Sequence, residues 1–107
     1  ALKYNYPKVV KHFFAPEDSW NNVYPNVLPQ WDRSPRAGKA EGVYINATPN
    51  NFKKHMEHAL EVIKNKQSEH RILFIRSWNE WGEGNYIEPD LKYGHGFLNA
   101  IQETIMK

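Results

Sequence analysis

The fold of this chain is decided by residues 71–90, which run RILFIRSWNEWGEGNYIEPD. An unbroken apolar segment, Ile72 to Ile75, predicts a buried β-strand near the start of this stretch. The polar residues 77–90 that follow predict a loop, which two glycines bend. Its carboxylates and aromatic rings are Glu80, Glu83, Glu88, Asp90, Trp78, Trp81 and Tyr86. Acids handle protons and hydroxyl groups and flat rings stack on sugar faces, so this pattern indicates a carbohydrate site.

The bulk composition is that of a small globular domain without cysteine chemistry. The chain has 107 residues, of which 40% are hydrophobic and 24% charged, so we expect one domain, residues 1–107. Its net charge of +2 is too small to indicate nucleic-acid binding. Cysteine is absent, which excludes disulfides and thiolate chemistry. No apolar run approaches transmembrane length, so no transmembrane segment is expected.

Extended and irregular segments are predicted for most of the first half of the chain. Residues 27–31 and 42–46 predict two short strands, the first with a proline near its end. Residues 3–14 suggest a short helix or turn, and the polar residues 16–26 predict a loop.

Two helices follow. Thr48 is a natural N-cap and Pro49 suits the first helical position, so a helix is predicted from there to about residue 66. A second helix is predicted after Gly96. Apolar residues recur at helical spacing in both helices: Phe52, Met56, Ala59, Leu60 and Ile63, then Phe97, Ala100, Ile101 and Ile105. The alternation of strands and helices predicts an α/β fold with parallel strands.

In parallel α/β folds the active residues lie in the loops that follow the strands. Residues 31–36 form one such loop and residues 77–90 another. We therefore expect Trp31 and Asp32 to contact a substrate. Two arginines of the first loop, Arg33 and Arg36, are either phosphate ligands or structural residues.

Residues 77–90, followed by Lys92-Tyr93-Gly94, resemble the C-terminal signature of the WbsX-type proteins. These are described as glycosyltransferases of bacterial surface-polysaccharide (O-antigen) synthesis and are similar in turn to the endo-α-mannosidases of glycoside hydrolase family 99. Residues 28–38 and 47–52 fit the same family in the same order. The resemblance covers residues 24–101.

The resemblance implies a (β/α)8 TIM-like barrel, of which this chain would be the C-terminal part with two to three strand–helix units. A full barrel takes about 250 residues. The remainder of the barrel, from the same parent chain or a partner, is therefore an expected partner. The resemblance also implies a cytoplasmic location in a bacterium, with membrane association through partners left open.

The resemblance implies catalytic roles for two glutamates. Glu80 would assist the 2-hydroxyl of the substrate as internal nucleophile, and Glu83 would be the general acid and then base at the glycosidic oxygen. At Gly82 the chain departs from the hydrolases, which often carry a larger polar residue there. The expected substrate-binding residues are Trp31, Asp32, Trp78, Asn79, Trp81, Tyr86 and Glu88.

The alternatives are solvated acids in the loop and tryptophans that belong to a barrel core. The leading function is a carbohydrate-active enzyme that transfers or hydrolyses glycosyl groups on a carbohydrate or nucleotide-sugar substrate. The alternative is a non-catalytic carbohydrate-binding or subunit-docking fragment. No cofactor is expected. His55 and His58 lie three residues apart, outside the apolar stripe of the helix and without a third ligand, so no metal site is predicted.

Overall fold

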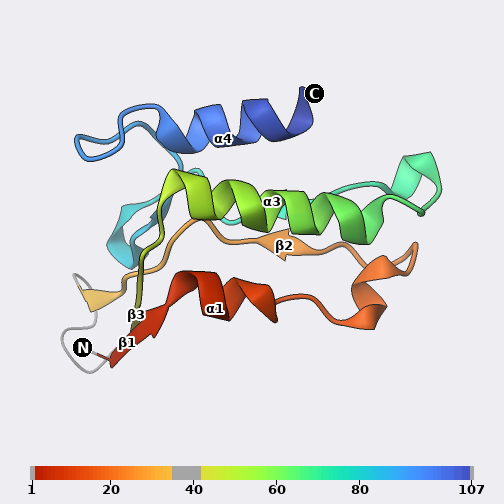
Figure 1. Ribbon diagram of the computed structural model, residues 1–107, viewed down its shortest axis with the longest axis horizontal. Helices are drawn as coiled ribbons and strands as arrows, with labels where there is room; N and C mark the ends of the chain where they lie inside the picture. The colour runs from red at the N-terminus through yellow and green to blue at the C-terminus, as the bar shows by residue number, and fades with distance from the viewer. Residues whose placement is uncertain (1, 35–41, 107) are drawn as a thin grey trace.

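Three helices lie side by side along the molecule, with α3 between α1 and α4, and pairs of short strands lie against them (Figure 1). The computed structural model describes residues 2–34 and 42–106. The strands are β1 (Leu2–Asn5), β2 (Asn26–Val27), β3 (Gly42–Ile45), β4 (Phe74–Ile75), β5 (Asn79–Glu80) and β6 (Asn85–Tyr86). The helices are α1 (Tyr6–Lys11), α3 (Pro49–Ile63) and α4 (Gly96–Ile105), with 3₁₀ turns η1 (Pro16–Ser19), η2 (Ser68–His70) and η3 (Trp81–Glu83).

The strands form three separate pairs. β1 pairs with β3 and β2 pairs with β4, both in parallel, whereas β5 and β6 form an antiparallel hairpin. Each parallel pair is joined through a connection that contains a helix, as parallel pairing requires. The predicted α/β class with parallel strands is therefore confirmed. No closed barrel is seen in residues 2–34 and 42–106.

Both helices of the second half are confirmed. The Thr48 hydroxyl oxygen accepts a hydrogen bond from the Asn51 backbone N–H at 3.1 Å, which caps the first turn of α3. α3 ends at Ile63, somewhat earlier than expected, and α4 covers the predicted final helix. The N-terminal segment predicted as a helix or turn contains both β1 and the helix α1.

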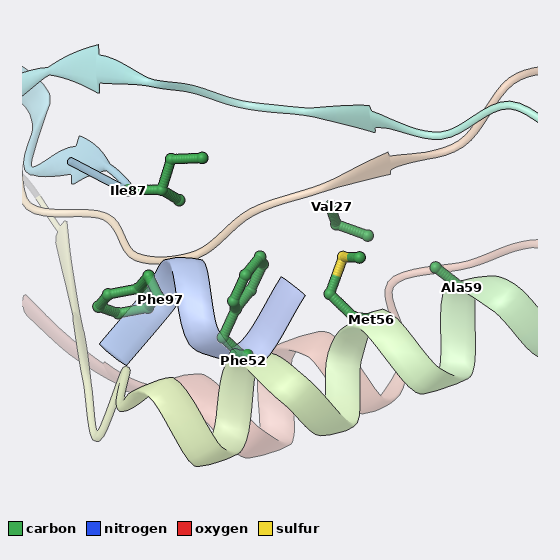
Figure 2. Close-up of a cluster of buried hydrophobic side chains, with 7 residues drawn as sticks. Val27, Phe52, Met56, Ala59, Ile87 and Phe97 are labelled. Atoms are coloured by element: carbon green, nitrogen blue, oxygen red, sulfur yellow. The ribbon is translucent and has the colours of Figure 1, made fainter. Parts of the chain in front are cut away.

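One apolar cluster holds the helices to the strands. In Figure 2, Phe52, Met56 and Ala59 on α3 point toward the strands, where Val27 lies, and Phe97 of α4 lies beside Phe52. The ring centroids of Phe52 and Phe97 are 5.6 Å apart. The cluster consists of Val27, Phe52, Met56, Ala59, Ile87, Phe97 and Ala100. Ile87 lies within the acidic loop of residues 77–90, directly after β6, so the same core that stabilises the helices also anchors that loop.

The buried strand predicted for residues 72–75 is only partly right. Only Phe74 and Ile75 pair as a strand, and Ile75 packs against the core together with Leu73. Ile72 and Phe74 point the other way and are 42% and 53% exposed. An apolar run is buried on both sides only when both faces of its sheet are covered. Here the helices cover one face, so the alternate side chains face solvent.

Two further expectations need correction around residue 28. The strand predicted for residues 27–31 ends at Val27, because Pro29 has no N–H to donate to a sheet. Instead, Leu28 N–H donates to His55 Nε2 at 3.2 Å, and the Tyr6 hydroxyl donates to Leu28 C=O at 2.6 Å. His55, expected outside the apolar stripe, is 2% exposed and stacks on Phe14. Its ring is buried among the rings of Tyr6, Phe13 and Phe14, and its Nε2 satisfies the buried Leu28 N–H.

Candidate functional site

The two loops singled out in the sequence meet in the structure. The Asp32 backbone N–H donates to the Glu83 carbonyl at 2.8 Å and so joins residues 31–34 to the acidic loop. Gly84 makes this approach possible. Its φ is +56°, and a Cβ there would lie 2.7 Å from the Cβ of Asp32 and 2.8 Å from its backbone nitrogen. Only glycine tolerates both the left-handed backbone and so close a neighbour.

Within the acidic loop, one serine ties the β5–β6 hairpin together. The Ser77 hydroxyl donates to the Asn85 carbonyl at 2.7 Å and accepts from the Glu80 backbone N–H at 3.2 Å. The Trp78 carbonyl accepts from Ile87 N–H at 3.1 Å. Since Ile87 belongs to the core cluster, the hairpin is positioned by the hydrophobic packing beneath it.

Two aromatic rings of the hairpin stack on each other. The ring centroids of Trp81 and Tyr86 are 3.6 Å apart and the ring planes differ by 14°. Trp81 Nε1–H donates to Glu88 Oε1 at 2.9 Å, and the Tyr86 hydroxyl donates to Asp90 Oδ2 at 2.9 Å. Asp90 in turn accepts from the Tyr93 backbone N–H at 2.7 Å. The rings of Trp81 and Tyr86 are therefore each held by the stacking contact on one face and by a hydrogen bond from the indole N–H or the phenol hydroxyl.

The hydroxyl of Tyr86 remains a donor under ordinary conditions. Burial, together with the hydrogen bond to Asp90, raises the pKa of Tyr86 to about 12. The phenol therefore stays protonated across the physiological range and keeps Asp90 oriented. The two side chains form a fixed pair of a hydrogen-bond donor and an acceptor.

A cleft of about 560 Å³ opens beside this stacked pair. Its walls come from the end of β3 and the turn into α3 on one side, and from the joined loops and residues 90–93 on the other. A cavity of this size with aromatic walls and a few polar groups is typical of a small-molecule site. The lining residues are Gln30, Trp31, Asp32, Val43, Tyr44, Ile45, Asn46, Ala47, Thr48, Trp81, Gly84, Tyr86, Asp90, Lys92 and Tyr93.

Some of the predicted site residues meet in this cleft, namely Trp31, Asp32, Trp81 and Tyr86. Glu88 does not line it but orients Trp81 through the hydrogen bond to the indole. The remaining predicted residues, Glu80, Glu83, Trp78 and Asn79, lie on the same hairpin and are not among the described residues that line the cleft. Trp78 and Asn79 are exposed, whereas Glu80 is half-buried.

The carboxylate of Glu83 lies between two arginines. Glu83 Oε2 is 3.7 Å from Arg33 Nε, and Glu83 Oε1 is 3.7 Å from a terminal guanidinium nitrogen of Arg76. The Arg76 guanidinium also lies over the Trp31 ring, 5.5 Å from its centroid. Asp32 Oδ1 accepts from the backbone N–H and hydroxyl of Ser34, which turns the first loop. These contacts join strand β4, the first loop and the acidic hairpin into one charged cluster beside the cleft.

Comparison with known proteins places the sequence in a family. The sequence model described as Glycosyltransferase WbsX matches residues 1–101. This chain belongs to the WbsX glycosyltransferase family. Two curated relatives, both named Uncharacterized protein WxcX and from two strains of Xanthomonas campestris pv. campestris, are 34% identical over 86 residues. The alignment covers 79% of this chain and 12% of each relative. No solved structure matches.

The structure brings to the cleft further residues that the sequence reasoning did not assign to substrate binding. Tyr44 lies on β3, and Asp90, Lys92 and Tyr93 follow the acidic hairpin. Asp90 is the fourth acid of the loop, and its position two residues after Glu88 was a usable signal. Tyr44 had no such signal, because its place in the cleft depends on contacts between distant segments, among them the hydrogen bond from its N–H to the Trp31 carbonyl at 2.9 Å.

Other expectations can be compared with the described part of the chain. Residues 2–34 and 42–106 contain no group of three or more histidine, cysteine or acidic side chains that could hold a metal ion. Arg36, one of the two arginines for which a phosphate-binding or a structural role was left open, lies outside the described residues. Across the same described ranges, every helix is too short or too polar to cross a bilayer.

Proposed function

We propose that this chain forms part of a carbohydrate-active enzyme that transfers or hydrolyses glycosyl groups in bacterial surface-polysaccharide metabolism. The observation that carries the proposal is the cleft in which Trp81 and Tyr86 stand beside the carboxylates of Asp32 and Asp90. Rings supply apolar faces for the C–H side of a sugar, and carboxylates accept hydrogen bonds from its hydroxyl groups. Membership of the WbsX glycosyltransferase family supports the same class of substrate.

In this proposal the acidic pair of the hairpin performs the chemistry. Glu80 ends β5 and Glu83 ends η3, so both are carried by the segment that holds the aromatic stack. A glycosidic oxygen leaves poorly unless it is protonated, and the oxocarbenium-like transition state needs negative charge nearby. Glu83 acts as acid and then base at the leaving oxygen, while Glu80 assists the 2-hydroxyl of the sugar. Glu88 keeps the indole of Trp81 oriented.

We further propose that more strand–helix units complete a barrel around these strands. Apolar side chains that remain exposed on the parallel strands or directly beside them support this, because parallel sheets are normally covered on both faces. Those side chains are Tyr4, Ile45, Ile72 and Phe74, which are all exposed. The chain spans 12% of the length of its curated relatives, so the covering units would come from the same parent chain or from a partner.

The experiment is an assay of the protein against aryl and oligomeric α-mannosides and against nucleotide-sugars. Glu80→Gln and Glu83→Gln are each expected to lower turnover at least about a hundredfold, the usual scale of an acid–base contribution. Glu17→Gln is the matched control, because Glu17 is exposed on η1 and lies outside the acidic hairpin. Full turnover in both hairpin variants would remove the catalytic assignment.

A non-catalytic carbohydrate-binding role is the second candidate, and one observation favours it. Among the described residues, Glu80 and Glu83 do not line the cleft, and Glu83 is held between Arg33 and Arg76. In this alternative, the two glutamates support the loop and the cleft alone binds sugar. Sugar binding that persists in both glutamine variants, with no turnover on any substrate of the panel, would establish it.

A further inference from the structure

A small hollow lies between the helices α1 and α3, which run side by side (Figure 1). Its volume is about 190 Å³, and it shares no residue with the cleft beside the aromatic stack. Its lining residues recur at helical spacing on both helices, so each helix turns one stripe of side chains toward the hollow. They are Pro7, Val10 and Lys11 of α1, and Asn51, Lys54, His55 and His58 of α3.

The stripe of α3 that faces this hollow is polar and basic. A helix stripe that only packs against a neighbouring helix is normally apolar, yet this one carries Lys54 and His58, and α1 adds Lys11 from the other side. All three side chains are exposed. The two acids of α3, Glu57 and Glu61, do not line the hollow. Because two like charges from different helices share one small space, the hollow carries a positive potential that an anion would lower.

The hollow is also lined by a buried hydrogen-bond donor that lacks an acceptor. His55 is 2% exposed, unlike the lysines around it. Its Nε2 accepts from Leu28 N–H, so the neutral ring carries its hydrogen on Nδ1. That Nδ1 is buried and has no hydrogen-bond partner among the described residues. Buried polar groups are nearly always hydrogen-bonded, so an unpartnered donor beside a basic hollow indicates a missing acceptor.

We propose that this hollow binds a phosphate group, carried either by a soluble molecule or by a lipid headgroup. Lys11 and Lys54 supply the positive charge, as lysines do in many phosphate sites. The ring of His58 adds a polar contact, and the anion, or water bound with it, provides the acceptor for His55. The hollow has room for about six water molecules, which suits a phosphate group but not a complete drug-sized ligand. The site is separate from the cleft, so the proposal does not depend on the carbohydrate function.

The first test is a titration of the 107-residue chain with sodium phosphate near neutral pH and at constant ionic strength, followed by NMR of the isotope-labelled protein. We expect saturable shifts centred on the residues that line the hollow, with a Kd of about 1 mM or tighter. Acetate should bind at least tenfold more weakly, because it carries a single charge. A response to phosphate that does not saturate, or that sodium chloride reproduces, would overturn the proposal.

Variants locate the binding. Lys11→Gln and Lys54→Gln each remove one charge at an exposed position and should each raise the Kd for phosphate at least about fivefold. Lys8→Gln is the matched control, because Lys8 is also an exposed lysine of α1 and does not line the hollow. Equal weakening in all three variants would show that phosphate responds only to the general surface charge, and the site would be discarded.

Vesicle sedimentation distinguishes the two sources of the phosphate group. The protein is mixed with phosphatidylcholine vesicles with and without phosphatidic acid, whose headgroup is a phosphate monoester. Binding that requires phosphatidic acid and is lost in the Lys11→Gln/Lys54→Gln double variant would assign the hollow to a lipid headgroup. Saturable binding of free phosphate without vesicle binding would assign it to a soluble phosphate. Failure to bind either one would overturn the proposal and leave the proposed function standing.

Discussion

The buried imidazole of His55 predicts that this protein loses stability in mild acid. His55 Nε2 accepts the hydrogen bond from Leu28 N–H, so that nitrogen must be unprotonated in the folded state. Burial, with a smaller contribution from the nearby His58, lowers the pKa of His55 from 6.5 to about 4. In the unfolded chain the imidazole of His55 becomes protonated near its ordinary pKa of 6.5, whereas in the folded chain it becomes protonated only near pH 4.

The sign and size of the effect follow from linkage. Between pH 6.5 and 4 the unfolded state binds more protons than the folded state, so the free energy of unfolding rises with pH. The contribution is complete above pH 6.5 and falls away as the pH drops toward the folded-state pKa. A separation of this size amounts to about 3 kcal/mol. That is a large share of the total of about 5–15 kcal/mol that a small domain has.

The assay is urea unfolding followed by tryptophan fluorescence at pH 7.5, 6, 5 and 4. Acidic residues titrate in this range too, so the effect is isolated by comparison with His55→Gln, which retains an acceptor but no titrating ring. The free energy of unfolding of the parent protein should fall by about 3 kcal/mol more than that of the variant. His58→Gln, at an exposed position of the same helix, should keep most of the parent's pH dependence, because His58 makes the smaller contribution to the lowered pKa of His55. Equal pH slopes for the parent and His55→Gln would refute the reasoning.

Three further substitutions test local parts of the structure by urea unfolding. Thr48→Ala removes the N-cap of α3 and should cost about 1 kcal/mol, whereas Thr48→Ser should cost less; equal losses would argue against the cap. Phe52→Ala empties the core beside Phe97 and should cost about 3–5 kcal/mol, and a loss under about 1 kcal/mol would contradict the packing. Gly84→Ala should cost about 2 kcal/mol or more, from the left-handed backbone and the contact with Asp32, and should weaken sugar binding in the same protein; a neutral result would mean that the two loops do not touch.

The sequence correctly predicted those features that depend on residues close together in the chain. Thr48 and Pro49 predicted the start of α3, and the apolar spacing predicted which face packs. Residues 77–90 were predicted as a loop that follows a strand, and the structure shows that this segment contains the β5–β6 hairpin and the stacked rings of Trp81 and Tyr86. The same rules failed at Ile72 and Phe74, because burial of a strand's second face depends on a covering layer that no local pattern reports.

The positions of the candidate site residues were likewise predicted in part from the sequence and decided in part by the tertiary structure. Trp31 and Asp32 are far along the chain from Trp81 and Tyr86, yet all four line one cleft. Their loops follow neighbouring parallel strands, so the general rule for such folds predicted that the loops would be near each other. It did not predict which side chains would turn into the cleft.

The sequence by itself determined the α/β class, the helices with their caps and apolar faces, and the family, because these depend on residue type and spacing along the chain. Only the tertiary structure decided that His55 is buried at a strand end, that Gly84 admits Asp32, and that Asp90 shares the cleft wall with the aromatic stack. Those outcomes depend on close approach between segments distant in the chain. Close approach is decided by the packing of whole elements, which no short pattern of residues specifies.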